Sequence, residues 1–218
     1  MNQPNIRINP EVIQEARAVL TTHAKSFSWA SFFLPKDRAD DAAVIYSFCR
    51  MVDDAVDEAE TDSVALTNIT EIKEEITQNK AKRIEVSSFL DVCERLSIPV
   101  ETAYDLIDGV YSDLEHVRIQ DNKELGIYCY RVAGVVGRMM CGVLGVSSHK
   151  AIPFAIDLGI AMQITNICRD ILEDARRDRI YIPQTMLYHY QITSQSLLEG
   201  ISDEHKIKMV VDHMLSLA

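Results

Sequence analysis

Apolar residues recur at helical spacing along almost the whole of this chain. Side chains three or four positions apart lie on one face of an α-helix, so this spacing predicts a helix wherever it persists for about ten residues or more. The β-branched residues follow the same spacing and do not alternate with polar residues, which leaves no good strand signal. The pattern predicts an all-α fold, with helices packed around one core.

The first predicted helix begins at a clear signal. Asn9 is a capping residue directly before Pro10, and proline is favoured in the first turn of a helix. Further helices are predicted at about 38–58, 64–78, 86–96, 100–116, 123–144 and 150–175. After Ile201 an apolar face recurs at helical spacing, and the sequence stops without a cap or a breaker. This end suggests either a piece of a longer protein or a last helix that packs on a partner.

Composition favours one domain in a reducing compartment. Of the 218 residues 47% are hydrophobic, and the 8 glycines and 6 prolines form no linker, so we expect a single domain over residues 1–218. The five cysteines are widely spaced and never form a CxxC pair, which argues against disulfides and zinc sites. The N-terminus has no signal-peptide pattern, and no run of about 18 uninterrupted apolar residues occurs. We therefore expect a cytoplasmic protein that is soluble or at most lies on a membrane surface.

The chain is acidic, with a formal net charge of −11 at pH 7. We expect no nucleic-acid partner, because binding to a phosphate backbone needs a basic face. An acidic protein that binds a polyanionic substrate needs metal ions or a local basic cluster to do so.

Two short acidic segments, DDAVDE at 53–58 and RDILED at 169–174, each place one aspartate four residues after another. The pairs are Asp53 with Asp57 and Asp170 with Asp174, and each pair lies on one face of a predicted helix. Mg²⁺ in proteins binds through a few carboxylates together with substrate phosphates. The two pairs, if they face each other, predict a magnesium site.

Polar residues extend the face of the first pair. Tyr46, Arg50, Asp53 and Asp57 are spaced 4, 3 and 4 residues apart and form one stripe. A guanidinium one turn away from carboxylates can hold a phosphate oxygen while the carboxylates hold a metal.

A longer polar ridge surrounds the second pair. Asn166, Asp170, Asp174 and Asp178 recur every fourth residue, and Gln163 precedes them. The first half of this helix is almost entirely apolar, which predicts burial. Polar side chains that project from a buried helix need polar partners. Ligands or metals would supply such partners.

Small residues continue the same helix faces. Ala155 and Gly159 precede the second ridge. Small residues also recur in and directly after the predicted helix at 123–144, at Gly134, Gly137, Cys141 and Gly145. Glycine costs about 1 kcal/mol against alanine inside a helix, so this many in one helix needs a reason. The reason is either a narrow apolar trough for a ligand or close helix–helix packing.

Simpler interpretations exist for each feature. One DxxxD motif is usually a solvated helix face, whereas two pairs that each adjoin an arginine favour a site more strongly. The spacing of Glu173 and Asp174 from Arg177 is also that of ordinary surface ion pairs. The six histidines form no ligand spacing, and Cys168 is expected to be a small core residue.

Four strings in order along the chain carry a family resemblance: HAKSFSWASFFLP, YSFCRMVDDAVDE, YCYRVAGVVG and QITNICRDILEDARRDRIYIP. Together they resemble the squalene/phytoene synthase family from about residue 23 to residue 183, and the last string is closer to bacterial phytoene synthases than to the squalene branch. The resemblance implies an isoprenoid synthase-type helical bundle around a central cavity. Family members continue through further helices, so this chain resembles a C-terminally shortened member.

The resemblance also implies roles for individual residues. The implied magnesium ligands are Asp53, Asp57, Asn166, Asp170 and Asp174. The implied contacts with diphosphate or with the reacting ends are Lys25, Ser26, Tyr46, Arg50 and Gln163. Phe27 and Tyr128 would line the cavity near the cationic centre. The walls around the prenyl chains would be shaped by Val132, Gly137, Ala155 and Gly159.

The implied reaction joins two prenyl diphosphates head to head through a cyclopropyl diphosphate. Geranylgeranyl diphosphate would give phytoene for carotenoid biosynthesis, and farnesyl diphosphate would give dehydrosqualene or, with NADPH as the reductant, squalene. A carbocation must form in a dry apolar cavity, where aromatic faces stabilise it without attacking it. Two alternatives stay open: a non-catalytic helical relative that acts in assembly or lipid binding, and a head-to-tail prenyltransferase or terpene cyclase. A lipophilic product is also compatible with peripheral membrane contact.

Overall fold

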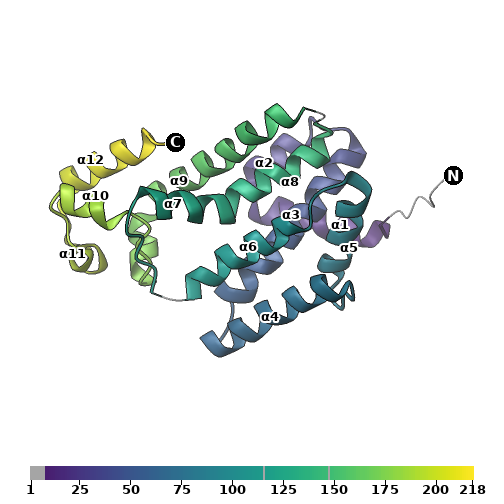
Figure 1. The fold of residues 1–218 in the computed structure, drawn as a ribbon, viewed down its shortest axis with the longest axis horizontal. Helices are drawn as coiled ribbons and strands as arrows, with labels where there is room; N and C mark the ends of the chain where they lie inside the picture. The colour runs from purple at the N-terminus through teal and green to yellow at the C-terminus, as the bar shows by residue number, and fades with distance from the viewer. Residues whose placement is uncertain (1–7, 115, 147) are drawn as a thin grey trace. The chain divides into compact units, whose positions relative to one another are not determined.

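The computed structural model describes residues 8–114, 116–146 and 148–218, and in this part of the chain every regular element is a helix (Figure 1). The elements in chain order are α1 (Pro10–His23), α2 (Lys25–Ser31), α3 (Lys36–Asp57), α4 (Asp62–Gln78), α5 (Ile84–Leu96), α6 (Glu101–Tyr111), η1 (Ser112–Leu114), α7 (Asn122–Cys129), η2 (Tyr130–Gly134), α8 (Val135–Leu144), η3 (His149–Ala151), α9 (Ile152–Arg176), α10 (Gln184–His189), α11 (Ser194–Leu198) and α12 (Glu204–Leu215). The predicted all-α fold class is confirmed.

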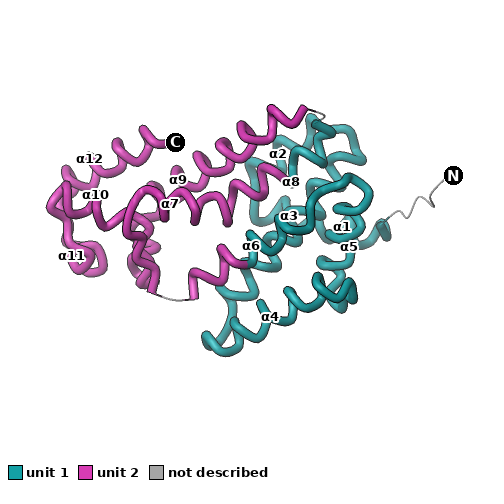
Figure 2. The backbone as a smooth tube through the Cα atoms, viewed as in Figure 1, with its two compact units in different colours: residues 1–107, 139–147 teal, residues 108–138, 148–218 magenta. Residues whose placement is uncertain are grey.

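The chain divides into two compact units, residues 1–107 with 139–147 and residues 108–138 with 148–218 (Figure 2). Each unit has its own packed core. The expectation of a single domain stays a prediction.

The first unit is built around α3, which packs against α1, α4 and α5. Its apolar face carries Ile45, Phe48 and Val52, all of them 1% exposed or less. The ring of Phe48 stacks on that of Phe89 from α5, with 3.9 Å between ring centroids. Arg95 on α5 donates two hydrogen bonds to the buried Asp41 carboxylate, at 2.6 and 2.9 Å.

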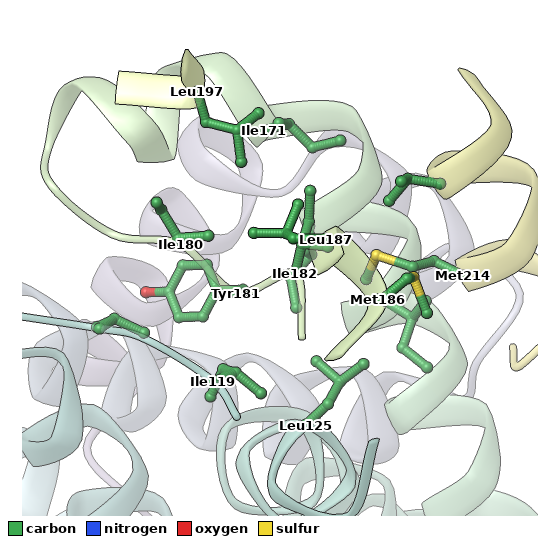
Figure 3. Packing of buried hydrophobic residues seen from close by; sticks show 14 of the residues in the cluster. Ile119, Leu125, Ile171, Ile180, Tyr181, Ile182, Met186, Leu187, Leu197 and Met214 are labelled. Atoms are coloured by element: carbon green, nitrogen blue, oxygen red, sulfur yellow. The ribbon is translucent and has the colours of Figure 1, made fainter. Parts of the chain in front are cut away.

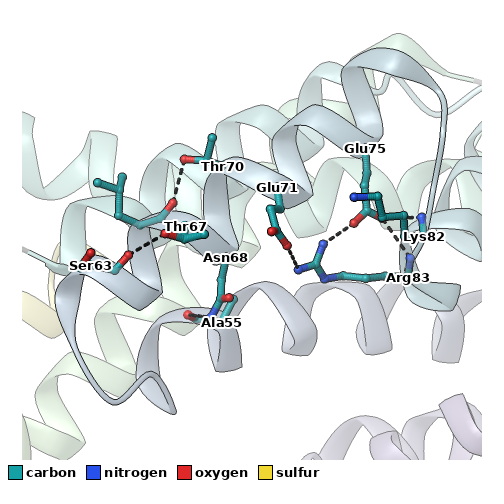
Figure 4. Close-up of polar contacts among 10 residues, drawn as sticks. Ala55, Ser63, Thr67, Asn68, Thr70, Glu71, Glu75, Lys82 and Arg83 are labelled. Atoms are coloured by element: carbon teal, nitrogen blue, oxygen red, sulfur yellow. Dashed lines mark hydrogen bonds and ion pairs between the residues drawn. The ribbon is translucent and has the colours of Figure 1, made fainter.

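A buried carboxylate holds the connection between α4 and α5 (Figure 4). Glu75 is 4% exposed, and its Oε2 accepts hydrogen bonds from the backbone N–H groups of Lys82 at 2.8 Å and Arg83 at 3.0 Å. The Arg83 guanidinium pairs with the other Glu75 oxygen and with Glu71. The Arg83 side chain makes no capping hydrogen bond to α5, and the Glu75 carboxylate accepts from the two backbone N–H groups directly before that helix.

The second unit packs around α9, which contacts η2, α7, α11 and α12. Figure 3 shows the core of this unit, where Leu125, Ile182 and Leu187 meet Met214 from α12. Val210 and Met214 are fully buried, so much of the apolar face of the last helix packs within this unit.

Two extended segments lie side by side in the second unit. A parallel bridge joins Arg118 to Ile180, and the Ile180 N–H donates to the Val117 carbonyl at 3.0 Å. Farther along, the Gln184 N–H donates to the Ile119 carbonyl at 2.8 Å. These bonds tie the segment that follows α9 to the segment that precedes α7.

Most of the predicted helices are present, and the differences concern one helix end, three short helices and one turn inside a helix. The predicted start at Pro10 is confirmed, because the Asn9 side chain accepts a hydrogen bond from the Glu11 N–H at 3.0 Å. The helix predicted at 100–116 ends earlier, at Tyr111, and residue 115 lies outside the described residues. The short helices α2, α10 and α11 are not predicted by the sequence pattern, because a stretch of five to seven residues is too short for a clear helical period.

The helix predicted at 123–144 is continuous, but its middle turn differs. Residues 130–134 form a π-helical segment, η2, between α7 and α8. Such segments add one residue to a turn and shift the side chains on either side of it.

Two helical stretches, Asn122–Leu144 and His149–Arg176, are long and apolar enough by composition to cross a membrane. This is weak evidence, since core helices of soluble proteins pass the same test. Both contain interior charges, among them Arg138 and Asp157. The N-terminal residues 1–7, on which the absence of a signal peptide was judged, lie outside the described residues.

Candidate active site

The first aspartate pair lies on a half-buried face of α3 in the first unit. Tyr46, Arg50 and Asp53 are partly exposed, and Asp57 in the last turn is exposed. The helix places them there because its opposite face is apolar and packs into the core. Partial burial, and next the charge of Asp53, raise the pKa of the Tyr46 phenol, so Tyr46 is neutral at physiological pH.

Arg50 has an ion-pair partner that the sequence interpretation missed. Its Nη2 lies 2.5 Å from the Asp54 carboxylate, one helical turn farther on. The spacing of four residues between Arg50 and Asp54 is the sequence signal from which this ion pair could have been predicted. The Arg50 Nε is buried and makes no hydrogen bond within the described part of the chain. The guanidinium therefore contains a buried donor that no described acceptor satisfies.

The predicted contacts Lys25, Ser26 and Phe27 form the start of α2, in the same unit. All three are exposed, and no residue of α2 is buried. The aromatic residues of this region, Trp29, Phe32 and Phe33, are 66%, 82% and 72% exposed. The segment thus presents one ammonium group and an aromatic surface.

The second aspartate pair lies on α9 in the second unit. Gln163, Asn166, Asp170 and Asp174 are all partly buried along one side of this helix, as the four-residue spacing predicts. Ile164, Ile167 and Ile171 are buried on the neighbouring face and anchor the helix in the core.

The two carboxylates of this pair have different electrostatic environments. Hydrogen bonds from the Arg169 guanidinium, at 2.6 and 2.8 Å, lower the pKa of Asp170. Burial, and next the negative charge of Asp170, raise the pKa of Asp174 to about 6. A cation bound between the two carboxylates would relieve both effects at Asp174, so this pair fits a divalent metal ion.

The oxygen donors of both pairs are of the kind that Mg²⁺ prefers. Within the described ranges, no three His, Cys, Asp or Glu side chains are placed so that they could hold a metal ion by themselves. Mg²⁺ commonly keeps waters and substrate phosphates among its ligands, so one or two carboxylates at each position are sufficient.

Asp178 does not belong to the ridge on which the four-residue repeat placed it. The helix α9 ends at Arg176, and Asp178 lies in the following turn with φ of 60°. Its carboxylate pairs with Arg118 and His116 on the neighbouring extended segment. The repeat continued in the sequence beyond the end of the helix, so the interpretation of Asp178 was wrong.

Tyr128 on α7 is 8% exposed and stacks on Tyr181, with ring centroids 4.7 Å apart. Both phenols donate hydrogen bonds to Asp113 in η1, from Tyr128 at 3.1 Å and from Tyr181 at 2.8 Å. Sequence reasoning missed Asp113 and Tyr181, because no spacing rule links residues from three separate segments. Val132, in η2, is partly buried against the core of this unit.

The small residues lie where two helices cross. A Cβ atom on Gly137 would lie 2.1 Å from the Ala155 carbonyl oxygen, and one on Gly159 would lie 2.5 Å from the Ala133 carbonyl oxygen. Both distances are far shorter than any Cβ contact allows. These residues therefore permit close packing of η2 and α8 on α9, and their role as cavity walls stays a prediction.

The chain is similar in sequence to known proteins along most of its length. The family model described as squalene/phytoene synthase matches residues 20–218. The 15-cis-phytoene synthase of Synechococcus elongatus is 32% identical over 89% of this chain and 68% of its own length. The phytoene synthase of Thermus thermophilus is 35% identical over 84% of this chain and 63% of its own length.

Solved structures agree at the level of the fold. A dehydrosqualene synthase superposes with a TM-score of 0.82 at 24% identity, covering 95% of this chain and 74% of that chain. A squalene synthase from Alicyclobacillus acidocaldarius superposes with a TM-score of 0.80 at 23% identity, covering 94% of this chain and 80% of that chain. The sequence match over residues 20–218 establishes that the chain belongs to the squalene/phytoene synthase family.

Proposed function

We propose that this protein joins two prenyl diphosphates head to head through a cyclopropyl diphosphate, with geranylgeranyl diphosphate as substrate and phytoene as product. The observation that carries the proposal is the half-buried ridge of Gln163, Asn166, Asp170 and Asp174 in a chain whose relatives include several phytoene synthases. The chain spans 62 to 68% of the length of three of these relatives. The activity of the whole protein therefore stays a proposal.

The magnesium ions would be held by Asp53 and Asp57 from α3 and by Asn166, Asp170 and Asp174 from α9. Bound Mg²⁺ supplies positive charge that neutralises the diphosphate leaving group. With a net charge of −11, the protein needs such a contribution or a local basic cluster to bind a polyanionic substrate.

The protein's own residues bind and orient the substrates. Arg50, whose side chain is 33% exposed beside its Asp54 partner, donates to a diphosphate oxygen through its guanidinium. Lys25, Ser26, Tyr46 and Gln163 complete the contacts with the diphosphates or the reacting ends. Ionisation of the allylic diphosphate then leaves a carbocation, which the aromatic faces of Phe27 and Tyr128 stabilise.

Water must be excluded from this cation, because hydrolysis to an alcohol competes with joining. The close crossing of η2 and α8 on α9, with backbone contact at Gly137 and Gly159, would form one dry wall beside the cation. The prenyl chains would extend along the apolar side of this crossing, past Val132, Gly137, Ala155 and Gly159. Loss of diphosphate and a proton in each of two steps gives the hydrocarbon.

The test incubates the purified protein with Mg²⁺ and geranylgeranyl diphosphate in the absence of NADPH. We expect release of pyrophosphate and formation of a C40 hydrocarbon, both abolished by Asp170→Asn. The matched control is Asp157→Asn, which removes an exposed carboxylate from the same helix and should leave the rate unchanged. No hydrocarbon from either geranylgeranyl or farnesyl diphosphate would contradict the proposal and favour a non-catalytic relative.

The same assay separates the alternatives within the family. A C30 product from farnesyl diphosphate would assign dehydrosqualene synthesis if it forms without NADPH, and squalene synthesis if it needs the reductant. We further propose a cytoplasmic protein that contacts membranes only peripherally, where its lipophilic product is released. Sedimentation with phospholipid vesicles tests this contact, and binding that resists high salt and carbonate washing would contradict it.

A further inference from the structure

A partly buried carboxylate in the second unit receives hydrogen bonds from two stacked tyrosines. The Asp113 Oδ2 atom accepts from the Tyr128 phenol at 3.1 Å, and its Oδ1 atom accepts from the Tyr181 phenol at 2.8 Å. The two tyrosines are 8% and 6% exposed, and their rings stack at an interplanar angle of 26°. One carboxylate thus fixes both phenol groups and the ring pair between them.

The three residues come from segments that are far apart in the sequence. Asp113 lies in the single turn η1, Tyr128 lies on α7, and Tyr181 lies in the extended segment after α9. That segment is bonded through Ile180 to the segment that follows η1. Figure 3 shows Tyr181 beside Ile180 and Ile182, whose side chains anchor it in the core. The carboxylate and its two tyrosines are therefore held by backbone hydrogen bonds as well as by packing.

The hydrogen bonds decide what the two phenols can offer a ligand. Each phenol has one O–H, which is directed to Asp113, and the two phenols also interact with each other, so neither has an O–H to donate to a ligand. Burial, and next the charge of Asp113, raise the pKa of both tyrosines above the ordinary value. Neutral phenols that cannot donate are poor nucleophiles, whereas their lone pairs and ring faces attract a cation.

Tyr181 also connects this group to the second aspartate pair. Tyr181 and Asp174 line the same small hollow, together with Arg179. The positive charge of Arg179 acts on both of them and opposes the rise in pKa at each. Tyr181, on which Tyr128 stacks, is thus fixed next to Asp174, one of the proposed magnesium ligands.

We propose that Asp113 is a positioning residue that holds Tyr128 and Tyr181 as one neutral aromatic pair for stabilising the carbocation. The inference rests on the proposed prenyl-joining function and adds two residues to it. Asp113 acts only through the tyrosines, and Tyr181 contributes its ring together with an acceptor oxygen. If Asp113 merely stabilised the fold, its loss would lower stability without changing how the cation partitions between products.

The experiment compares Asp113→Asn and Tyr181→Phe with the wild-type protein. Asp113→Asn keeps the size of the side chain but removes its charge and one of its two acceptor oxygens, so that only one phenol retains its acceptor. Tyr181→Phe removes one O–H and retains the ring. The matched controls are Tyr188→Phe, at a tyrosine that is 86% exposed, and Asp157→Asn, at an exposed aspartate. Each protein is assayed with geranylgeranyl diphosphate for kcat, KM and the ratio of hydrocarbon to prenyl alcohol, and near-ultraviolet circular dichroism reports on the stacked tyrosines.

We expect Asp113→Asn to lower kcat by roughly 10- to 100-fold with little change in KM, as misplacement of a positioned group does. The share of prenyl alcohol should rise, because a less stabilised cation is captured more often by water, and the tyrosine circular dichroism should weaken. Tyr181→Phe should change the product ratio in the same direction, while both controls match the wild type.

Two results would overturn the inference while leaving the proposed function intact. The first is an Asp113→Asn protein that is less stable but keeps the wild-type kcat and product ratio. The second is a Tyr181→Phe protein that folds, as judged by circular dichroism, and yields no additional alcohol. Absence of any hydrocarbon from the wild-type protein would instead refute the proposed function itself.

Discussion

At the scale of single residues, charge burial has opposite consequences at different carboxylates of this protein. Glu75 is enclosed by donors, and these donors hold its pKa below the ordinary value although burial opposes them. Asp174 has mainly burial and a neighbouring carboxylate around it, and its pKa is raised to about 6. The first arrangement stabilises the fold at neutral pH, and the second weakens it.

The Glu75 arrangement predicts a loss of stability on substitution. Glu75→Gln should lower the free energy of unfolding at pH 7 by about 2 kcal/mol, since a buried charge-assisted hydrogen-bond network is broken. The folded-state pKa is depressed, so the stabilisation is complete above the unfolded pKa and is lost as pH falls through the folded value. Urea unfolding at pH 7 and pH 3 should show a difference between wild type and variant that shrinks at the lower pH.

The control for this prediction uses the second carboxylate on the same arginine. Glu71 also pairs with Arg83, at 2.8 Å, but its side chain is 49% exposed. Glu71→Gln should therefore cost less than about 1 kcal/mol. Equal losses for the two variants would contradict the importance assigned to burial at Glu75.

The Asp174 arrangement predicts a gain in stability together with a loss of function. A raised folded-state pKa means that the charged form is disfavoured in the fold, so its cost grows as pH rises from the unfolded value toward 6. Without added metal, Asp174→Asn should raise Tm by roughly 1 to 4 °C at pH 7 and by less at pH 4.5. The variant should at the same time lose the ability to form hydrocarbon.

Asp170→Asn serves as the comparison with the opposite sign. The pKa of Asp170 is lowered by the Arg169 hydrogen bonds, so the charged form is favoured in the fold. Its substitution should leave Tm unchanged or lower it. A rise in Tm for both variants would show that simple removal of negative charge, and not the environment of Asp174, is responsible.

At the scale of elements, glycine has different roles at different helical positions. Gly137 and Gly159 let η2 and α8 approach α9 at backbone distance, whereas a Cβ atom added to Gly126 on α7 would meet nothing within 4 Å. Helical period alone does not distinguish these positions. The difference arises from which neighbour crosses the helix at each glycine.

This contrast predicts opposite effects of the same substitution. Gly137→Ala should lower the free energy of unfolding by about 2 kcal/mol or more, because the added carbon would collide with the Ala155 carbonyl oxygen. Gly126→Ala should raise it by roughly 0.5 to 1 kcal/mol, because alanine favours the helix and meets no neighbour. Urea unfolding midpoints test both, and a stabilising Gly137→Ala would refute the close crossing.

At the scale of the whole molecule, the proposed function requires the two aspartate pairs to act on one diphosphate. The pairs belong to different compact units, so their cooperation is a functional hypothesis that a double-mutant cycle tests. Asp53→Asn and Asp170→Asn should each lower kcat by at least roughly 100-fold. The double variant should fall well short of the product of the two effects, because groups that act as a unit are not additive.

The control cycle pairs Asp37→Asn with Asp157→Asn, which remove exposed carboxylates from α3 and α9. Neither change should alter the rate, alone or combined. Removal of Mg²⁺ with a chelator should stop pyrophosphate release in the wild type, and re-addition should restore it. Multiplicative effects of the two aspartate substitutions would contradict a shared site.

Much of the fold was predictable from local pattern alone. The long helices α3, α5 and α9 were expected within a few residues, because helical spacing, caps and breakers act within one or two turns. The ridge of Asn166, Asp170 and Asp174 was predictable for the same reason, since all three share one helix. The repeat misled only at Asp178, where the helix had already ended.

The sequence by itself determined the all-α class and the two aspartate faces, because both depend on the spacing of residues within one helix. It also determined the family, because the family is recognised from short sequence segments. Only the tertiary structure decided that Asp113 joins Tyr128 to Tyr181 and that Gly137 and Gly159 face a neighbouring backbone. Those contacts join segments separated in the sequence. Their formation depends on how the packed helices bring these segments together, which no local spacing encodes.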